Sequence, residues 1–189
     1  MNLPAYGCKI CMKITEKIRQ EITQIEFRDD ISNDKKISNI IHMGCASCAG
    51  VAIQPLPFAD ILILTPLQGY FASRIAAIHG IQLSENEALD WVKEIIALVG
   101  LGMAAQQIAL GIWKTVTFGF GGLLSIPLVY ALTYAVLKVA DVYFSHKAKN
   151  EKLSEERIKA VWKEAFAQGK QQAKGKEKWG KDQQHVEND

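Results

Sequence analysis

Four cysteines form the only spacing in this chain that suggests metal or redox chemistry, as two C-x-x-C pairs: Cys8 with Cys11, and Cys45 with Cys48. Four thiolates can close a tetrahedral zinc site or hold an iron–sulfur cluster. However, the gap between the pairs is longer than in the usual zinc ribbon. Cys45 and Cys48 also fall within a helical pattern of small apolar residues, where a buried cysteine acts as a small hydrophobe. We therefore expect no cofactor, and we keep zinc, an iron–sulfur cluster, or acylation of Cys8 or Cys11 as alternatives.

Other catalytic groups are not assembled by spacing. No serine, histidine and carboxylate set can be assigned, and the four histidines have no metal-ligand spacing with one another. A G-x-x-x-x-G-K-[ST] phosphate loop is absent from the sequence. The net charge of +2 gives no strong bias toward nucleic acid. These observations predict a protein that is not an enzyme and has no nucleic-acid partner.

The middle of the chain is strongly apolar. Residues 95–137 contain a single charged side chain, Lys114. Each half of this stretch is about 20 residues long, the length that crosses ~30 Å of hydrocarbon. The stretch therefore predicts either a helical hairpin in a membrane or two apolar helices hidden in a soluble bundle. We expect Lys114 to mark the turn between the two halves; the alternative is a lysine that lines a pore or binds lipid phosphate.

Helical patterns surround this stretch, and no segment has a strand pattern. We expect helices over about 9–26, 34–53, 58–79, 84–113 and 115–144, and a last helix from Ser154, with a kink or break near Thr65 caused by Pro66. Ser84 with Glu87 predicts a capping box, and Gly80 predicts a helix end. The predicted fold class is an all-α helical bundle with a central apolar helical hairpin and no β-sheet.

Three regions follow from the composition. Residues 1–33 form an N-terminal amphipathic helix and linker, and residues 34–168 form the helical domain. Residues 169–189 are polar, and we expect a disordered tail there. The lysines of this tail, with Trp179 among them, could instead contact anionic lipid headgroups.

One segment has a more specific pattern, AGVAIQPLPFADILILTPLQGYFASRIAAIHGI. It resembles the signature of the domain of unknown function 697 family, and the resemblance extends over about residues 35–168. The matching positions are Pro55, Pro57, Asp60, Gln68, His79 and Gly80. The resemblance implies an all-helical, membrane-associated module that is often linked to an Era-like GTPase domain. Because this chain has no phosphate loop, any GTPase would be a separate partner. We expect Asp60 to cap a helix N-terminus, with a functional buried carboxylate as the alternative.

Together these patterns favour a non-enzymatic membrane anchor or adaptor for a GTPase. We expect it in a bacterial inner membrane with both termini in the cytoplasm. Candidate partners are membrane lipids, the Era-like GTPase and a second copy of the chain. A membrane-perturbing or pore-forming protein with a hidden hairpin is the first alternative. A soluble zinc or redox protein that uses the four cysteines is the second.

Overall fold

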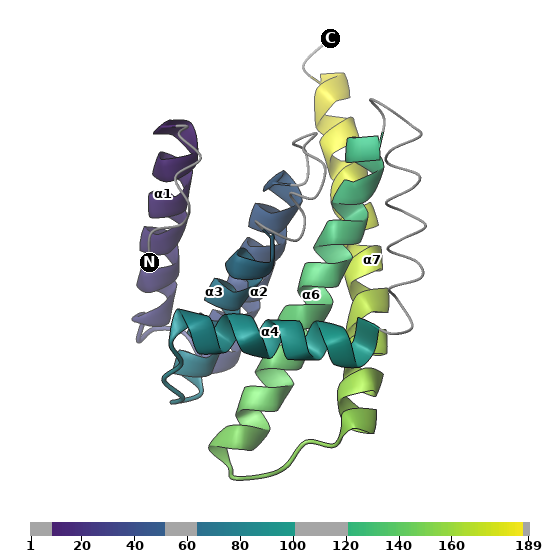
Figure 1. The fold of residues 1–189 in the computed structure, drawn as a ribbon. Coiled ribbons are helices and arrows are strands. Elements are labelled where there is room, and N and C mark those ends of the chain that lie inside the picture. The colour runs from purple at the N-terminus through teal and green to yellow at the C-terminus, as the bar shows by residue number, and fades with distance from the viewer. Residues whose placement is uncertain (1–8, 52–63, 101–120, 187–189) are drawn as a thin grey trace.

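The computed structural model describes residues 9–51, 64–100 and 121–186. Regular structure in these ranges is helical throughout, without a strand, so the predicted all-α class is confirmed. The helices are α1 (Lys9–Glu26), α2 (Asn33–Val51), α3 (Thr65–Ile78), α4 (Glu85–Gly100), α6 (Gly121–Ala148) and α7 (Glu155–Val186) (Figure 1).

Helix α6 is the centre of the packing. It contacts α7 most extensively, and then α2 and α3. Its sequence is apolar on all sides, which is typical of a helix that other helices enclose. Most of its residues from Val129 to Ala140 are buried in the main hydrophobic core. The other helices therefore derive much of their stability from covering α6.

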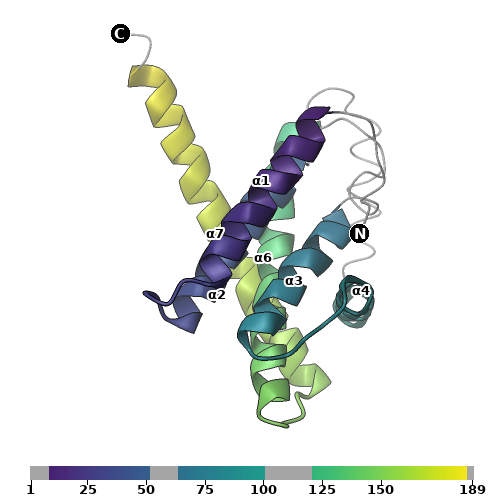
Figure 2. The same ribbon diagram turned by 90° about the vertical axis from the view of Figure 1, so that its left-hand side faces the viewer.

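Helix α4 has an orientation that the sequence does not suggest. It lies across α6 and α7 in Figure 1, and the perpendicular view of Figure 2 shows it end-on beside α3. It packs mainly against α3, and the Trp91 ring lies 5.4 Å from the ring of Tyr143 and 5.0 Å from that of Phe144. Residues 101–120, with Lys114, lie outside the described ranges, so the complete hairpin is not tested. Its described first part, residues 95–100, belongs to α4 and does not run along α6.

The predicted capping box at the start of α4 is confirmed. The backbone N–H of Ser84 donates to Glu87 Oε2 at 2.8 Å, and the N–H of Glu87 donates to Ser84 Oγ at 3.3 Å. The Ser84 side chain, through its hydrogen bond, and its backbone N–H hold the pKa of Glu87 below its usual range. This reciprocal pairing satisfies two N–H groups that have no partner inside a helix.

Helix α3 has the predicted end. Gly80 has a φ of +80°, the left-handed conformation that glycine adopts without strain. Its N–H donates to the carbonyl of Ala77 at 2.9 Å, and the next N–H bonds one residue further back, as in a Schellman motif. At the other end, Pro66 lies in the first turn, where its missing N–H costs no helical hydrogen bond. Residues 52–63 lie outside the described ranges, so the expected start at residue 58 is not tested.

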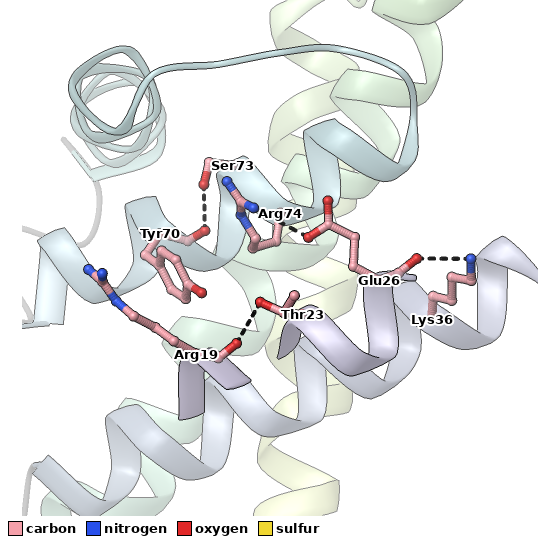
Figure 3. A network of polar contacts seen from close by, with 7 residues as sticks. All are labelled: Arg19, Thr23, Glu26, Lys36, Tyr70, Ser73 and Arg74. Carbon is pink, nitrogen blue, oxygen red and sulfur yellow. Dashed lines mark hydrogen bonds and ion pairs between the residues drawn. The ribbon is translucent and has the colours of Figure 1, made fainter. Parts of the chain in front are cut away.

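Helix α1 is joined to α2 and α3 by a small polar network, which Figure 3 shows from close by. Glu26 accepts a hydrogen bond from Arg74 at 3.3 Å, and its carbonyl accepts one from Lys36 at 3.0 Å. The guanidinium groups of Arg19 and Arg74 lie 5.5 and 5.7 Å from the centre of the Tyr70 ring. Together with buried Ile22, these contacts hold the predicted amphipathic helix on the bundle.

The prediction of a disordered tail from residue 169 is wrong, because α7 continues without a break to Val186. Gly169 does not end the helix; it allows close packing on α6. A Cβ at this position would lie 2.8 Å from Ala131 Cα and 3.1 Å from Tyr134 Cβ. Ala165 and Ala173, one turn to either side, are also buried. Small residues at every fourth position therefore let the two backbones approach closely.

This close approach predicts opposite effects for two glycines of the same helix. Gly169→Ala places a methyl group against the backbone of Ala131, so we expect the free energy of unfolding to fall by about 1–3 kcal/mol. Gly175 has open space at its Cβ position, and Gly175→Ala should stabilise the protein by about 0.5–1 kcal/mol. Denaturant unfolding of both variants checks this, and equal effects would contradict the packing of α7 on α6.

Candidate membrane-association site

Helix α6 presents polar side chains on one face. Tyr130, Thr133, Lys138 and Asp141 recur at helical spacing on the side that meets α2 and α3. Three of them, Tyr130, Thr133 and Asp141, form hydrogen bonds with side chains from those two helices or their ends. A buried polar group without such a partner is costly. This face therefore marks the side of α6 that must remain in contact with protein.

The deepest contact joins α3 to α6. Gln68 Nε2 donates to Thr133 Oγ1 at 3.1 Å, and both side chains are buried. Gln68 is one of the positions in the predicted motif, and the structure gives it a partner 65 residues away in the sequence. Polar pairs of this kind hold helices together in apolar surroundings.

A charged cluster lies near the other end of the same face. His79 Nε2 lies 3.0 Å from Asp141 Oδ1, and Lys138 Nζ lies 3.3 Å from Asp141 Oδ2. His79 is the C-cap residue of α3. Since Gln68 pairs with Thr133 and His79 pairs with Asp141, α3 and α6 run in the same direction. Two of the six positions of the family resemblance thus fasten α3 to α6.

A third contact, between His42 and Tyr130, is one that the sequence analysis did not anticipate. His42 Nδ1 lies 3.1 Å from the Tyr130 hydroxyl, and that hydroxyl donates to Gln172 Oε1 at 3.5 Å. The contact joins α2, α6 and α7, and the His42 ring also lies 6.2 Å from the Tyr134 ring. In the sequence, the hydroxyl of Tyr130 within a mainly apolar helix is the feature that could have indicated this contact. The partners of Tyr130 are too distant in the sequence to be identified from it.

Of the four cysteines of the candidate metal site, the structure describes the side chains of Cys45 and Cys48, so the complete site is not tested. Cys45 and Cys48 are both buried, and Cys48 packs with Leu64 and Val129. Burial raises the pKa of the Cys48 thiol to about 12, whereas a zinc or iron–sulfur site needs thiolates. No group of three metal-ligating side chains occurs among the described residues. Cys8 and the side chain of Cys11 lie outside the described part of the chain. The described pair therefore fits a core role better than a ligand role.

The remaining predicted positions have mixed outcomes. Pro55, Pro57, Asp60 and Lys114 lie outside the described ranges, so their roles are not tested. Gly80 ends α3 as expected. The site is therefore built from Gln68 and His79 of the motif and from the polar face of α6.

One described helix is long and apolar enough to cross a membrane, judged by length and composition. It is Ile126–Ala148, 23 residues with a mean hydropathy of 1.4, and 56% of its most apolar window is buried within the fold. The core helix of a soluble protein meets the same criteria. The charged and basic residues of α6, from Lys138 onward, are gathered in its C-terminal part. Helix α6 is thus both the central core helix and the candidate membrane span.

In the part of the chain that the structure describes, these features define an all-helical module with one helix suited to a membrane. No family model matches the chain, and no solved structure matches it. The chain is 24% identical over 147 residues to magnetosome membrane protein 22 of Magnetospirillum gryphiswaldense, covering 75% of this chain and 74% of that protein. A relative that is a membrane protein and one suitably apolar helix support a membrane-associated module.

The pairing of Gln68 with Thr133 predicts a measurable coupling. Thr133→Val keeps the shape but removes the acceptor of the Gln68 amide, so the free energy of unfolding should fall by about 1–3 kcal/mol. Adding Gln68→Leu should recover part of that loss, because both polar partners are then gone. Denaturant unfolding of the wild type, the two single variants Thr133→Val and Gln68→Leu, and the double variant measures the coupling free energy between the two side chains. Ser73→Ala is the control, because that buried hydroxyl donates to a carbonyl of its own helix. A coupling near zero would overturn the role of the pair.

The buried cysteines predict slow thiol chemistry. In a Cys8→Ser/Cys11→Ser variant at pH 8, Cys45 and Cys48 should react with a thiol reagent on the order of 1,000-fold more slowly than in urea, because they are buried and Cys48 is protonated. The folded-state pKa of Cys48 lies above its unfolded value. The stabilisation that comes from burying the neutral Cys48 thiol is therefore fully present below about pH 8.5. It is lost as the pH rises toward 12, the folded-state pKa. Rapid labelling of the folded variant would contradict the burial of Cys45 and Cys48 and would favour the metal or redox alternative.

Proposed function

We propose that the chain is a non-enzymatic, membrane-associated helical module that acts as a membrane anchor or adaptor for a separate GTPase. The observation that carries the proposal is the arrangement of α6. It is the most apolar described helix, and its polar groups are hydrogen-bonded to α2 and α3. A helix with this distribution can have lipid on its apolar side while its polar side remains satisfied by protein.

Helices α2 and α3 suit the same role. The described C-terminal part of α2, residues 43–51, and the N-terminal part of α3, residues 64–73, contain no charged side chain. Cys48, Leu64 and Val129 pack together, so these uncharged parts lie at the same end of the bundle as the uncharged part of α6. The three helices thus form one uncharged end, beyond which Arg74 and Lys138 introduce charge. This shared boundary suits an anchor formed by these three helices, because hydrocarbon excludes charge. Helices α1 and α7, which carry Arg19 beside Tyr70 and Lys170 next to Gly169, would then lie outside the hydrocarbon.

The GTPase partner is proposed from the family resemblance. Gln68 and His79, two of the residues that carry that resemblance, have partners on α6, so they act within the bundle in this structure. The inner membrane, the cytoplasmic termini and self-association belong to the same proposal.

A second candidate function is favoured by one observation. More than half of the apolar window of α6 is buried within the fold, much of it under α7. A bundle that hides an apolar helix in this way can also carry a membrane-insertion device. That function, a membrane-perturbing or pore-forming protein, differs from an anchor because insertion would release vesicle contents.

Alkaline carbonate extraction of membranes from bacteria that express the full chain tests the anchor. We expect the protein to stay in the pellet. Leu132→Arg places a charge on the apolar part of α6, at a cost of about 2.5–3.5 kcal/mol in a membrane, and should shift the protein toward the supernatant. Ala148→Arg adds the same charge at the exposed helix end and should leave the protein in the pellet.

Two further readouts separate the candidate functions. Leakage of dye from vesicles on addition of the purified protein would favour the membrane-perturbing function over the anchor. For the partner, the protein is purified from cells in GDP or in a non-hydrolysable GTP analogue. A GTP-binding protein retained in one nucleotide state would support the adaptor, and its absence in both would overturn that part. Full release of the wild-type chain by carbonate would overturn the anchor.

A further inference from the structure

Helix α7 has two faces of opposite character. One face covers α6 with buried side chains, among them Val161, Trp162 and Ala165, and with the close-packed Gly169. The other face is open to solvent and carries lysines. The helix therefore covers the apolar core with one face and leaves the other face available for a binding partner.

Among the side chains of α7 that the structure describes, four exposed lysines lie along one side of the helix and are called the lysine ridge: Lys159, Lys163, Lys170 and Lys174. Their spacing of four, seven and four residues returns each to the same side of the helix. The ridge is roughly 22 Å long at 1.5 Å per residue. All four side chains are exposed. Glu155 offsets part of the charge at one end, where its carboxylate lies 3.7 Å from Lys159 Nζ.

An aromatic residue accompanies the ridge. Phe166 is half-buried beside it, and the ammonium group of Lys170 lies 4.4 Å from the centre of the Phe166 ring. Basic side chains next to a partly exposed aromatic on an amphipathic helix are typical of helices that lie on a membrane surface. A straight ridge also matches a planar, extended partner.

We propose that the lysine ridge docks this module onto a membrane surface that contains anionic lipid. The proposal rests on the membrane association proposed above and names the lipid class and the protein face for it. Charge complementarity carries the choice, because each lysine near an anionic surface strengthens binding roughly fivefold. The proposed binding partner is therefore a membrane surface to which lipid phosphate or carboxylate groups give a net negative charge. A surface of zwitterionic lipid has no such charge.

The packing of α7 on α6 gives this docked state a defined orientation. The two helices run side by side in opposite directions, with Gly169 against Ala131 and Gln172 near Tyr130. When the ridge lies along the membrane, α6 lies along it as well and does not cross it. Docking is therefore a peripheral, salt-sensitive state, and anchoring by α6 is a separate step in which α7 leaves α6.

Vesicle co-sedimentation of the full chain tests the proposal, with vesicles of phosphatidylcholine alone or with 30% phosphatidylserine, in low and high salt. The wild-type chain should bind the phosphatidylserine vesicles, and added salt should release it. A variant with Lys159, Lys163, Lys170 and Lys174 all changed to Gln should bind at least roughly tenfold more weakly. Circular dichroism confirms that the variant is folded.

The matched control changes four other exposed lysines, Lys35, Lys93, Lys149 and Lys152, to Gln. It loses the same charge and should bind much as the wild type does. Equal weakening in both variants would show an effect of net charge alone and would overturn the ridge. Undiminished binding of the ridge variant, or equal binding to both vesicle types, would also overturn it. Carbonate extraction tests anchoring by α6, whereas vesicle co-sedimentation tests docking by the lysine ridge. The two assays are independent, so either proposal can be overturned while the other stands.

Discussion

The structure depends on the need to enclose α6, a helix that is apolar on almost every side. Its buried residues meet α7, α2 and α3, and no other described helix makes so many of the core contacts. In water, such a helix is stable only inside a shell of other helices. The amphipathic character of α1 and α7 follows from this need, because each has one side for the bundle and one for solvent.

Two different kinds of contact hold that shell together. On the α2 and α3 side, three side-chain hydrogen bonds accompany the apolar packing, through Thr133, Tyr130 and Asp141. On the α7 side, the contact is mostly apolar packing, with close approach of the backbones at Gly169 and large buried side chains such as Val161 and Trp162. The Tyr130 hydroxyl also donates to Gln172 at 3.5 Å. The first kind fixes which side chains meet, while the second depends on backbone proximity.

The parts of the fold that the sequence predicts well are governed by local rules. The capping box at Ser84 and the left-handed Gly80 were both predictable, since each needs only neighbours along the chain. The extent of α7 was not predictable. A glycine such as Gly169 can end a helix or can let the helix pack closely on a neighbour, here on Ala131, and the sequence looks the same in both cases. Likewise, the sequence singles out Gln68 but cannot name Thr133 as its partner, and the crosswise direction of α4 depends on packing between distant segments.

The unequal contacts also indicate which side of α6 lipid could replace. Lipid chains can substitute for apolar packing, but they supply no acceptor for Gln68 and no partner for Asp141. Separating α6 from α2 and α3 in a membrane would therefore leave buried polar groups without partners, whereas separating it from α7 would lose mainly dispersion contacts that lipid restores. In a membrane, the α6–α7 interface is thus the one that lipid could most readily replace, although it is the largest interface of α6. The lysine ridge lies on the outer face of the same α7, so binding of that face to a charged surface would act on the helix whose apolar contacts with α6 lipid can replace.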